Sequence, residues 1–246
     1  MVDHVLPGSP PVPLLLRRSA RARRISLRVS QLDGRVTLTV PTGVSEAEAL
    51  DFAVSKSDWV RGHLAGRAGD VAIGPGAVLP VEGVPRRVVI GGTRRVRLEP
   101  DALVLPAGQP GARAQAWLKA LARDRLAEAS DRHAAALGRR YTRLTLRDTR
   151  SRWGSCSSAG ALMYSWRLVM APPGILDYVA AHEVAHLAEM NHSPAFWAVV
   201  HRLYGPHDAA RAWLRNDGPA LHRYRFDMAA NEADEAAAEL SADAGD

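Results

Sequence analysis

The chain has 246 residues, of which 47% are hydrophobic and 24% charged, the composition of a globular protein with one large or two small domains. No stretch approaches the roughly 18 uninterrupted apolar residues of a membrane span, and the first residues lack a secretory-signal pattern, so we expect a cytoplasmic protein without a membrane partner. A single cysteine, Cys156, excludes an intramolecular disulfide and a cysteine-rich zinc site, which leaves histidine and carboxylate as possible metal ligands.

The first elements after a Pro-rich lead are two strands. Residues 23–29 and 35–40 alternate polar and apolar side chains with period two, and the Asp33-Gly34 pair between them is typical of a hairpin turn. A helix is predicted next, because Ser45 and Glu48 form a capping box. We expect it to reach about Leu64, and the following residues to form its inner face: Ala49, Leu50, Ala53, Val54 and Trp59.

The middle of the chain changes character twice. Residues 69–105 contain recurring Gly and Pro with short β-branched runs, which indicates short strands. Residues 108–111 then contain Gly, Pro and Gly directly before a helical pattern over 112–137, so we place a domain boundary there. The prediction is a β-rich amino-terminal region with one helix, 1–110, and a second domain, 111–227.

The second domain is predicted to contain a strand over 142–147, a hairpin turning near Ser158-Ala159-Gly160, and a helix starting at about Ile175. The last nineteen residues, 228–246, include six acids and no Lys or Arg, and we expect them to be disordered or weakly helical. The predicted fold class is therefore α+β.

A motif on the helix predicted to start at about Ile175 indicates metal binding. The sequence HEVAH places His182 and His186 four residues apart, on one helix face, where two imidazoles can converge on one Zn²⁺. Glu183 lies about 100° further around the helix, so it does not compete for the ion and can act on water as a general base.

A third ligand is expected close by. Glu189 shares the helix face, but it lies a full turn beyond a metal bound between the two histidines. His192 is better placed if the helix ends near Asn191 in a left-handed conformation, and the N-cap signal Ser193-Pro194 supports that break. We therefore predict His192 as third ligand, with Glu189 as a partner of a ligand or a surface residue.

Four long motifs now resemble the YgjP-like zinc metallopeptidases, which are related to the SprT-like proteases: RSRWGSCS at 150–157, SWRLVMAPP at 165–173, DYVAAHEVAHL at 177–187 and NHSPAFW at 191–197. The resemblance extends over most of residues 15–225. It implies a zincin-like metallopeptidase domain in which His182, His186 and His192 bind zinc and Glu183 is catalytic. The metzincin ligand spacing also matches, but Glu189 stands where those enzymes have a turn-forming Gly.

Further candidates have two interpretations each. Trp153, Gly154 and Ser155 can belong to an edge strand that binds a peptide substrate, or to a packed hairpin. Cys156 can approach the metal as a thiolate, or be a small buried residue. An electrophile for the oxyanion is also needed, and we consider Arg167, Tyr164 and His201. The remaining histidines are expected to be surface or satisfied core residues: His4, His63, His133, His207 and His222.

The sequence thus predicts a hydrolase of the metalloendopeptidase kind, with one zinc ion and a peptide or protein substrate; it makes no prediction of oligomeric state. The alternative starts from charge, since 32 basic residues face 26 acidic ones. An Arg-rich strand over 17–28 could bind nucleic acid, with a structural zinc or DNA-linked proteolysis. Because 30 of the 32 basic residues are Arg, a solvated surface typical of the whole chain is the other interpretation.

Overall fold

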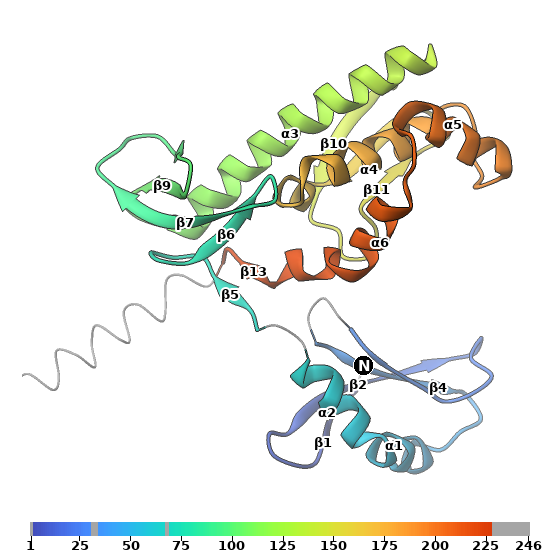
Figure 1. Ribbon diagram of the computed structural model, residues 1–246. Coiled ribbons are helices and arrows are strands. Elements are labelled where there is room, and N and C mark those ends of the chain that lie inside the picture. The colour runs from blue at the N-terminus through green and yellow to red at the C-terminus, as the bar shows by residue number, and fades with distance from the viewer. Residues whose placement is uncertain (1, 31–33, 67–68, 228–246) are drawn as a thin grey trace, which may run out of the picture. The chain divides into compact units, whose positions relative to one another are not determined.

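The computed structural model describes residues 2–30, 34–66 and 69–227, which form a mixed α+β fold with a β-rich amino-terminal part, as predicted (Figure 1). By their contacts the residues divide into two compact units, Met1–Gly69 and Asp70–Asp246. The boundary predicted at residue 110 falls inside the second unit, and the division into 1–110 and 111–227 stays a prediction. The acidic tail, 228–246, lies outside the described residues. None of the described helices is long and apolar enough to cross a membrane.

The first unit is a four-stranded sheet with two helices, whose elements are β1 (Val2–Leu6), β2 (Val12–Ser19), β3 (Ser26–Val29), β4 (Val36–Pro41), α1 (Glu46–Ser55) and α2 (Ser57–Ala65). The strand order is β1-β2-β4-β3, and only the β2–β4 pair is parallel. The predicted pairing of β3 with β4 is confirmed, while three residues of its turn, 31–33, are outside the described part. The Pro-rich lead also forms strands, because Val12, Leu14 and Leu16 alternate onto the buried face.

The predicted single helix in this unit is wrong in one respect, because it breaks at Lys56 into α1 and α2. The hydroxyls of Ser55 and Ser57 donate to the carbonyls of Phe52 and Val54, at 2.7 and 2.8 Å, and such bonds compete with regular helical bonding. The break also changes which face is buried. Two residues expected inside, Val54 and Trp59, are 46% and 45% exposed, while Ala49, Ala53 and Val60 are buried.

The second unit begins with a four-stranded sheet of order β6-β7-β9-β8, formed by β6 (Val78–Val81), β7 (Val84–Gly91), β8 (Arg97–Leu98) and β9 (Ala102–Pro106). The long helix α3 (Pro110–Leu137) follows, as predicted, and Leu118, Ala122 and Leu126 on it are fully buried. A short parallel pair joins the two ends of the unit, since β5 (Val71–Ala72) lies beside β13 (Tyr224–Arg225).

The remaining elements surround one central helix, α4 (Pro173–Ala185), which packs against α3 (Figure 1). A second sheet of order β10-β12-β11 supplies β10 (Arg143–Arg147), β11 (Gly154–Cys156) and β12 (Ala161–Ser165). Its β11–β12 hairpin turns at Ser157–Gly160, as predicted. The other neighbours are the 3₁₀ segments η1 (Trp166–Met170) and η2 (Gly218–Arg223), with helices α5 (Pro194–Tyr204) and α6 (Asp208–Asn216). Because α4 contacts β11, α5 and α6, residues at its carboxyl end can meet side chains from all three.

Candidate metal centre

The HEVAH segment forms the carboxyl end of α4. The helix starts at Pro173, where a missing N–H costs nothing, and its last two turns are packed through alanines in the core. Three of these alanines, Ala180, Ala181 and Ala185, are fully buried. The helix is therefore held rigidly where His182 and Glu183 project from it.

The chain leaves α4 earlier than predicted. The last helical residue is Ala185 and His186 is the C-cap, so the expected end near Asn191 is wrong. Tight bonds make the turn: Leu187 N–H donates to Val184 O and Ala188 N–H to Ala185 O. Asn191 is not among the described residues with positive φ, so no left-handed cap is used.

The predicted restart of the chain is confirmed. The Ser193 hydroxyl accepts a hydrogen bond from Phe196 N–H at 3.3 Å, and Pro194 occupies the first position of α5. The six residues between His186 and Ser193 therefore form a short return loop, and this loop carries His192 back beside His182.

Three histidines converge at this point. The candidate ligand atoms of His182, His186 and His192 all lie within 4.8 Å of one another, and Nε2 of His182 is 3.1 Å from Nε2 of His192. Zinc–nitrogen bonds of about 2.0–2.1 Å in tetrahedral geometry place two ligand nitrogens about 3.3–3.4 Å apart. The donor set and its spacing therefore fit a Zn²⁺ ion. His182 is half-buried, His186 buried and His192 exposed, so the cluster opens to solvent on the His192 side.

The surroundings favour neutral imidazoles, the form that binds metal. Burial, followed by the charges of His186 and His192, lowers the pKa of His182 to about 3. Burial also lowers the pKa of His186. Nδ1 of His186 donates to the carbonyl oxygen of Glu189 at 3.0 Å, which leaves Nε2 with its lone pair for the ion. Glu189 thus supports a ligand through its main chain.

Phe196 forms an apolar wall beneath the cluster. Its ring stacks on His186 with centroids 4.4 Å apart, and it meets His182 and His192 edge to face at 4.9 and 4.7 Å. A fully buried aromatic ring in contact with all three imidazoles restricts their rotation. The three imidazoles are therefore held in this arrangement by packing alone.

Glu183 is 6% exposed, and burial raises its pKa to about 8 although the charge of Arg152 acts in the opposite direction. The backbone of β11 lies directly against its carboxylate: a Cβ placed on Gly154 would be 2.6 Å from both Cγ and Oε1 of Glu183. Only glycine fits this approach without displacing the carboxylate. Gly154 therefore belongs to the site as the residue that makes room for Glu183.

The other residues predicted for substrate binding have different positions. β11 is an edge strand of the second sheet, because it pairs with β12 alone, and Ser155 lies opposite Met163 in that pair. The Trp153 ring packs inward, against Gly218 and against His222 at a centroid distance of 5.4 Å. The segment thus has features of both interpretations: β11 lies at the edge of its sheet, and Trp153 is packed against neighbouring residues.

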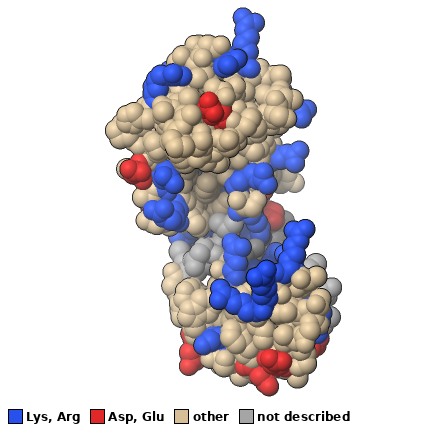
Figure 2. Space-filling view, turned by 90° about the vertical axis from the view of Figure 1, so that its right-hand side faces the viewer, with Lys and Arg blue, Asp and Glu red and all other residues tan. Residues whose placement is uncertain are grey.

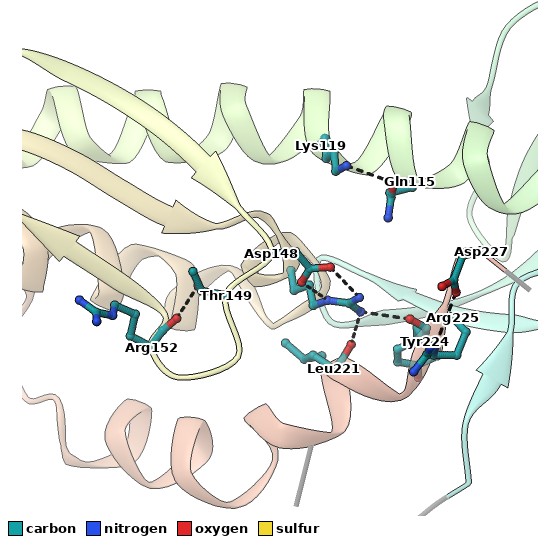
Figure 3. A network of polar contacts seen from close by, with 10 residues as sticks. Gln115, Lys119, Asp148, Thr149, Arg152, Leu221, Tyr224, Arg225 and Asp227 are labelled. Carbon is teal, nitrogen blue, oxygen red and sulfur yellow. Dashed lines mark hydrogen bonds and ion pairs between the residues drawn. The ribbon is translucent and has the colours of Figure 1, made fainter. Parts of the chain in front are cut away.

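Arg167 is not brought to the histidines. Its guanidinium belongs to a separate polar network, in which Nε and Nη2 donate to Asp148 at 2.7 and 3.0 Å. Figure 3 shows Asp148 on one side of this network and Leu221 and Tyr224 on the other. Nη1 donates to the carbonyl oxygens of Leu221 and Tyr224. Burial alone would raise the pKa of Asp148, but the hydrogen bonds and charge of Arg167 outweigh it and lower that pKa. The network ties η1 to η2 and to the loop that leads into β11.

The remaining candidates are also placed elsewhere. Tyr164 is fully buried with its hydroxyl 3.1 Å from Ser130 Oγ, and His201 is exposed on α5. Burial, followed by the charge of Glu183, raises the pKa of Cys156 to about 11, so at neutral pH it is a thiol. Neither an inhibitory thiolate nor an oxyanion role for these residues gains support.

Sequence reasoning missed a stack of side chains beside His182, here called the aromatic stack: Tyr178, His207, Trp197 and Arg211. The Tyr178 and His207 rings are 5.9 Å apart and 9° from parallel, His207 and Trp197 are 5.2 Å and 12°, and the Arg211 guanidinium lies 4.6 Å from the Trp197 ring. The stack joins α4, α5 and the first turn of α6, so no spacing within one helix could reveal it. His207 was expected to be a surface or core residue.

A mixed α+β fold that gathers three histidines and one buried carboxylate at a helix end has the character of a metallopeptidase. Comparison with known families agrees, because the YgjP-like metallopeptidase domain matches residues 23–217, most of the chain. This protein therefore belongs to the YgjP-like metallopeptidase family, as the motifs predicted. No curated protein matches the sequence. Among solved structures, the crystal structure of the metallopeptidase zymogen of Pyrococcus abyssi abylysin matches with 18% identity and a TM-score of 0.33, over 37% of this chain and 95% of that one.

Proposed function

We propose that this protein hydrolyses peptide bonds with one Zn²⁺ ion held by His182, His186 and His192, and with Glu183 as general base. The observation that carries the proposal is the convergence of the ligand nitrogens of His182, His186 and His192 within 4.8 Å. The buried carboxylate of Glu183 directly follows His182 on α4. Three protein ligands leave one position of a tetrahedral ion open, the arrangement of catalytic zinc sites.

When bound, zinc supplies a Lewis acid that lowers the pKa of water toward about 7 and polarises a peptide carbonyl. The Glu183 carboxylate accepts the proton of the attacking water and returns it to the nitrogen of the leaving amine. Gly154 keeps the carboxylate in place through its close backbone, and His186 is oriented by Glu189 O.

The substrate is proposed to bind along β11. An extended peptide can add to an edge strand through main-chain hydrogen bonds, and β11 offers one edge beside Glu183. This placement needs no particular side chain, so an unfolded segment of a protein is a suitable substrate.

The test combines metal analysis with proteolysis of an unfolded protein by the wild type, Glu183→Gln and Glu189→Gln. Glu183→Gln should retain stoichiometric zinc and lose hydrolysis by at least about 100-fold, the usual contribution of a general base. Glu189→Gln is the matched control, since Glu189 acts through its carbonyl and not through its carboxylate. Undiminished hydrolysis by Glu183→Gln removes Glu183 from its role.

A second candidate function, nucleic-acid binding, is supported by the charge distribution of the first unit. Figure 2 shows basic side chains gathered on one side of this unit and acidic ones on another. The exposed arginines of β2, β3 and the loop between them are Arg17, Arg18, Arg21, Arg23, Arg24 and Arg28. The exposed acids come from the helices: Glu46, Glu48, Asp51 and Asp58. One-sided positive charge is what phosphate backbones select.

Binding of double-stranded DNA should then weaken steeply with salt, with a slope of about −0.9 in log affinity per phosphate contacted. Replacing Arg21, Arg23 and Arg24 together by alanine should reduce that slope. The same change at three exposed arginines of the second unit, Arg94, Arg95 and Arg97, should not. A chain that does not bind DNA at low salt has no such function.

A further inference from the structure

Arg211 is the outermost member of the aromatic stack, and the stack fixes its position. Its guanidinium lies 4.6 Å from the centre of the Trp197 ring, while its side chain stays 47% exposed. Asp208, the acid that it meets on its own helix, is 4.0 Å away and fully exposed, so that pair holds it weakly. A guanidinium stacked on a ring keeps its N–H groups in the plane available for another partner.

The ring that carries Arg211 is also in contact with the metal ligands. Trp197 lies 5.7 Å from His182 and 5.7 Å from His192, measured between ring centroids. The guanidinium is therefore held on the Trp197 side of the histidine cluster, the side that includes the exposed His192.

A second cation approaches the site from a different segment. Arg152, in the loop before β11, is exposed and stands two residues before Gly154, whose backbone lies against the Glu183 carboxylate. Its carbonyl accepts from Thr149 Oγ1 at 2.8 Å, and Figure 3 shows its side chain extending away from the network around Arg167. The loop is thus anchored by its main chain while the guanidinium is left exposed near Glu183.

We propose that Arg211, assisted by Arg152, makes this site selective for peptides that carry an acidic side chain next to the cleaved bond. The inference rests on the proposed peptidase function. Two guanidinium groups beside ligands for a dication give a strongly positive rim, which attracts carboxylates and repels lysine and arginine side chains. The planar guanidinium of Arg211 can bind a carboxylate through two parallel hydrogen bonds, which adds geometric selection to the charge.

The test measures kcat/KM for matched peptides that differ only by Glu, Gln or Lys at one position beside the cleaved bond, with the position varied along the peptide. The wild type should cleave the best-placed Glu peptide about 10-fold faster than its Gln partner, the range of one charge-assisted hydrogen bond. Arg211→Met keeps a long side chain on Trp197 but removes the charge, and should bring the Glu/Gln ratio close to one. Arg211→Glu should favour the Lys peptide.

Arg215→Ala is the matched control, because Arg215 is an exposed arginine on the same helix, and its Glu/Gln ratio should equal that of the wild type. Zinc content measured in each variant shows whether the site is intact. A wild type without preference for Glu, or an Arg211→Met variant with an unchanged ratio, overturns the inference. Equal slowing of all peptides by Arg211→Met also overturns it, and would assign Arg211 to the carbonyl oxygen instead. Failure of the peptidase proposal is distinct, since then no hydrolysis sensitive to Glu183→Gln is seen with any peptide.

Discussion

The contact between Gly154 and Glu183 makes Gly154→Ala the sharpest single perturbation of this site. The added Cβ would be 2.6 Å from Cγ and Oε1 of Glu183, whereas carbon atoms in van der Waals contact prefer about 3.5–4.0 Å. Either the carboxylate or the β11 backbone must therefore move by about 1 Å. Both surfaces are packed, because Glu183 is buried on α4 and β11 is paired with β12.

A displacement of about 1 Å at a catalytic group costs about 100-fold in rate, so kcat/KM on an unfolded protein substrate should fall by about that factor. Overpacking of this size should also lower the free energy of unfolding by about 1–3 kcal/mol. Zinc content should stay at one ion per chain, since the three histidines are not touched. The assays are initial-rate proteolysis, metal analysis and urea denaturation of the same preparations.

Gly92→Ala is the control for this experiment. No heavy atom lies within 4 Å of a Cβ built on Gly92, so this change adds the same methyl group without a clash. It should leave the rate and the zinc content as in the wild type. The reasoning is refuted if Gly154→Ala cleaves substrate at the wild-type rate, because the carboxylate would then have room that the geometry denies it.

Two further predictions concern His192 on the return loop and the polar network around Arg167. His192→Ala should lower the zinc content well below one ion per chain. His201 is an exposed residue on α5, and His201→Ala should keep the full zinc content. Full zinc in His192→Ala would remove His192 from the set of proposed ligands. Asp148→Asn leaves the buried Arg167 without its charge partner and should destabilise the fold by about 2–3 kcal/mol at pH 7, less than the 3–5 typical of fully buried pairs because Asp148 is 41% exposed. The pKa of Asp148 is lowered in the fold, so its stabilising effect is present above its ordinary value of 3.8 and is lost as the pH falls below it. Urea denaturation of both proteins at pH 7 and pH 3 should show the gap narrowing at pH 3, and equal stabilities at pH 7 would contradict the role given to this pair.

Much of the fold could be predicted because its signals are local. The N-cap at Ser45, the helix over 112–137 and the N-cap at Ser193 each depend on a few neighbouring residues, and each is present. The break at Lys56 was missed because serine hydroxyls bind helical carbonyls only once the side chains take particular rotamers. The parallel pairing of β2 with β4 was missed because it joins segments about twenty residues apart, and no residue pattern within either strand specifies its partner.

The residues of the candidate site also fall into those that local sequence predicts and those that depend on contacts between distant segments. His182, Glu183 and His186 follow from helix geometry within five residues. His192 lies beside the other two histidines, but the turn that brings it there begins at His186 and not at Asn191 as predicted. Gly154 and Arg211 depend on which elements meet in three dimensions, and periodicity in one segment contains no such information. Candidate ligands on one helix can be predicted from their spacing, whereas the residues that other elements place around them cannot.

The early end of α4 has an electrostatic consequence for the metal. The peptide dipoles of a helix sum to a partial negative charge, about half an elementary charge, at its carboxyl end, and this effect is concentrated in the last turn. His182 lies in that last turn and His186 caps it, so a cation bound between them sits where the helix itself is negative. A helix continuing to Asn191 would have moved this end more than a turn beyond the ligands. By ending at Ala185, α4 would add its own field to the attraction between the proposed histidine ligands and a bound cation.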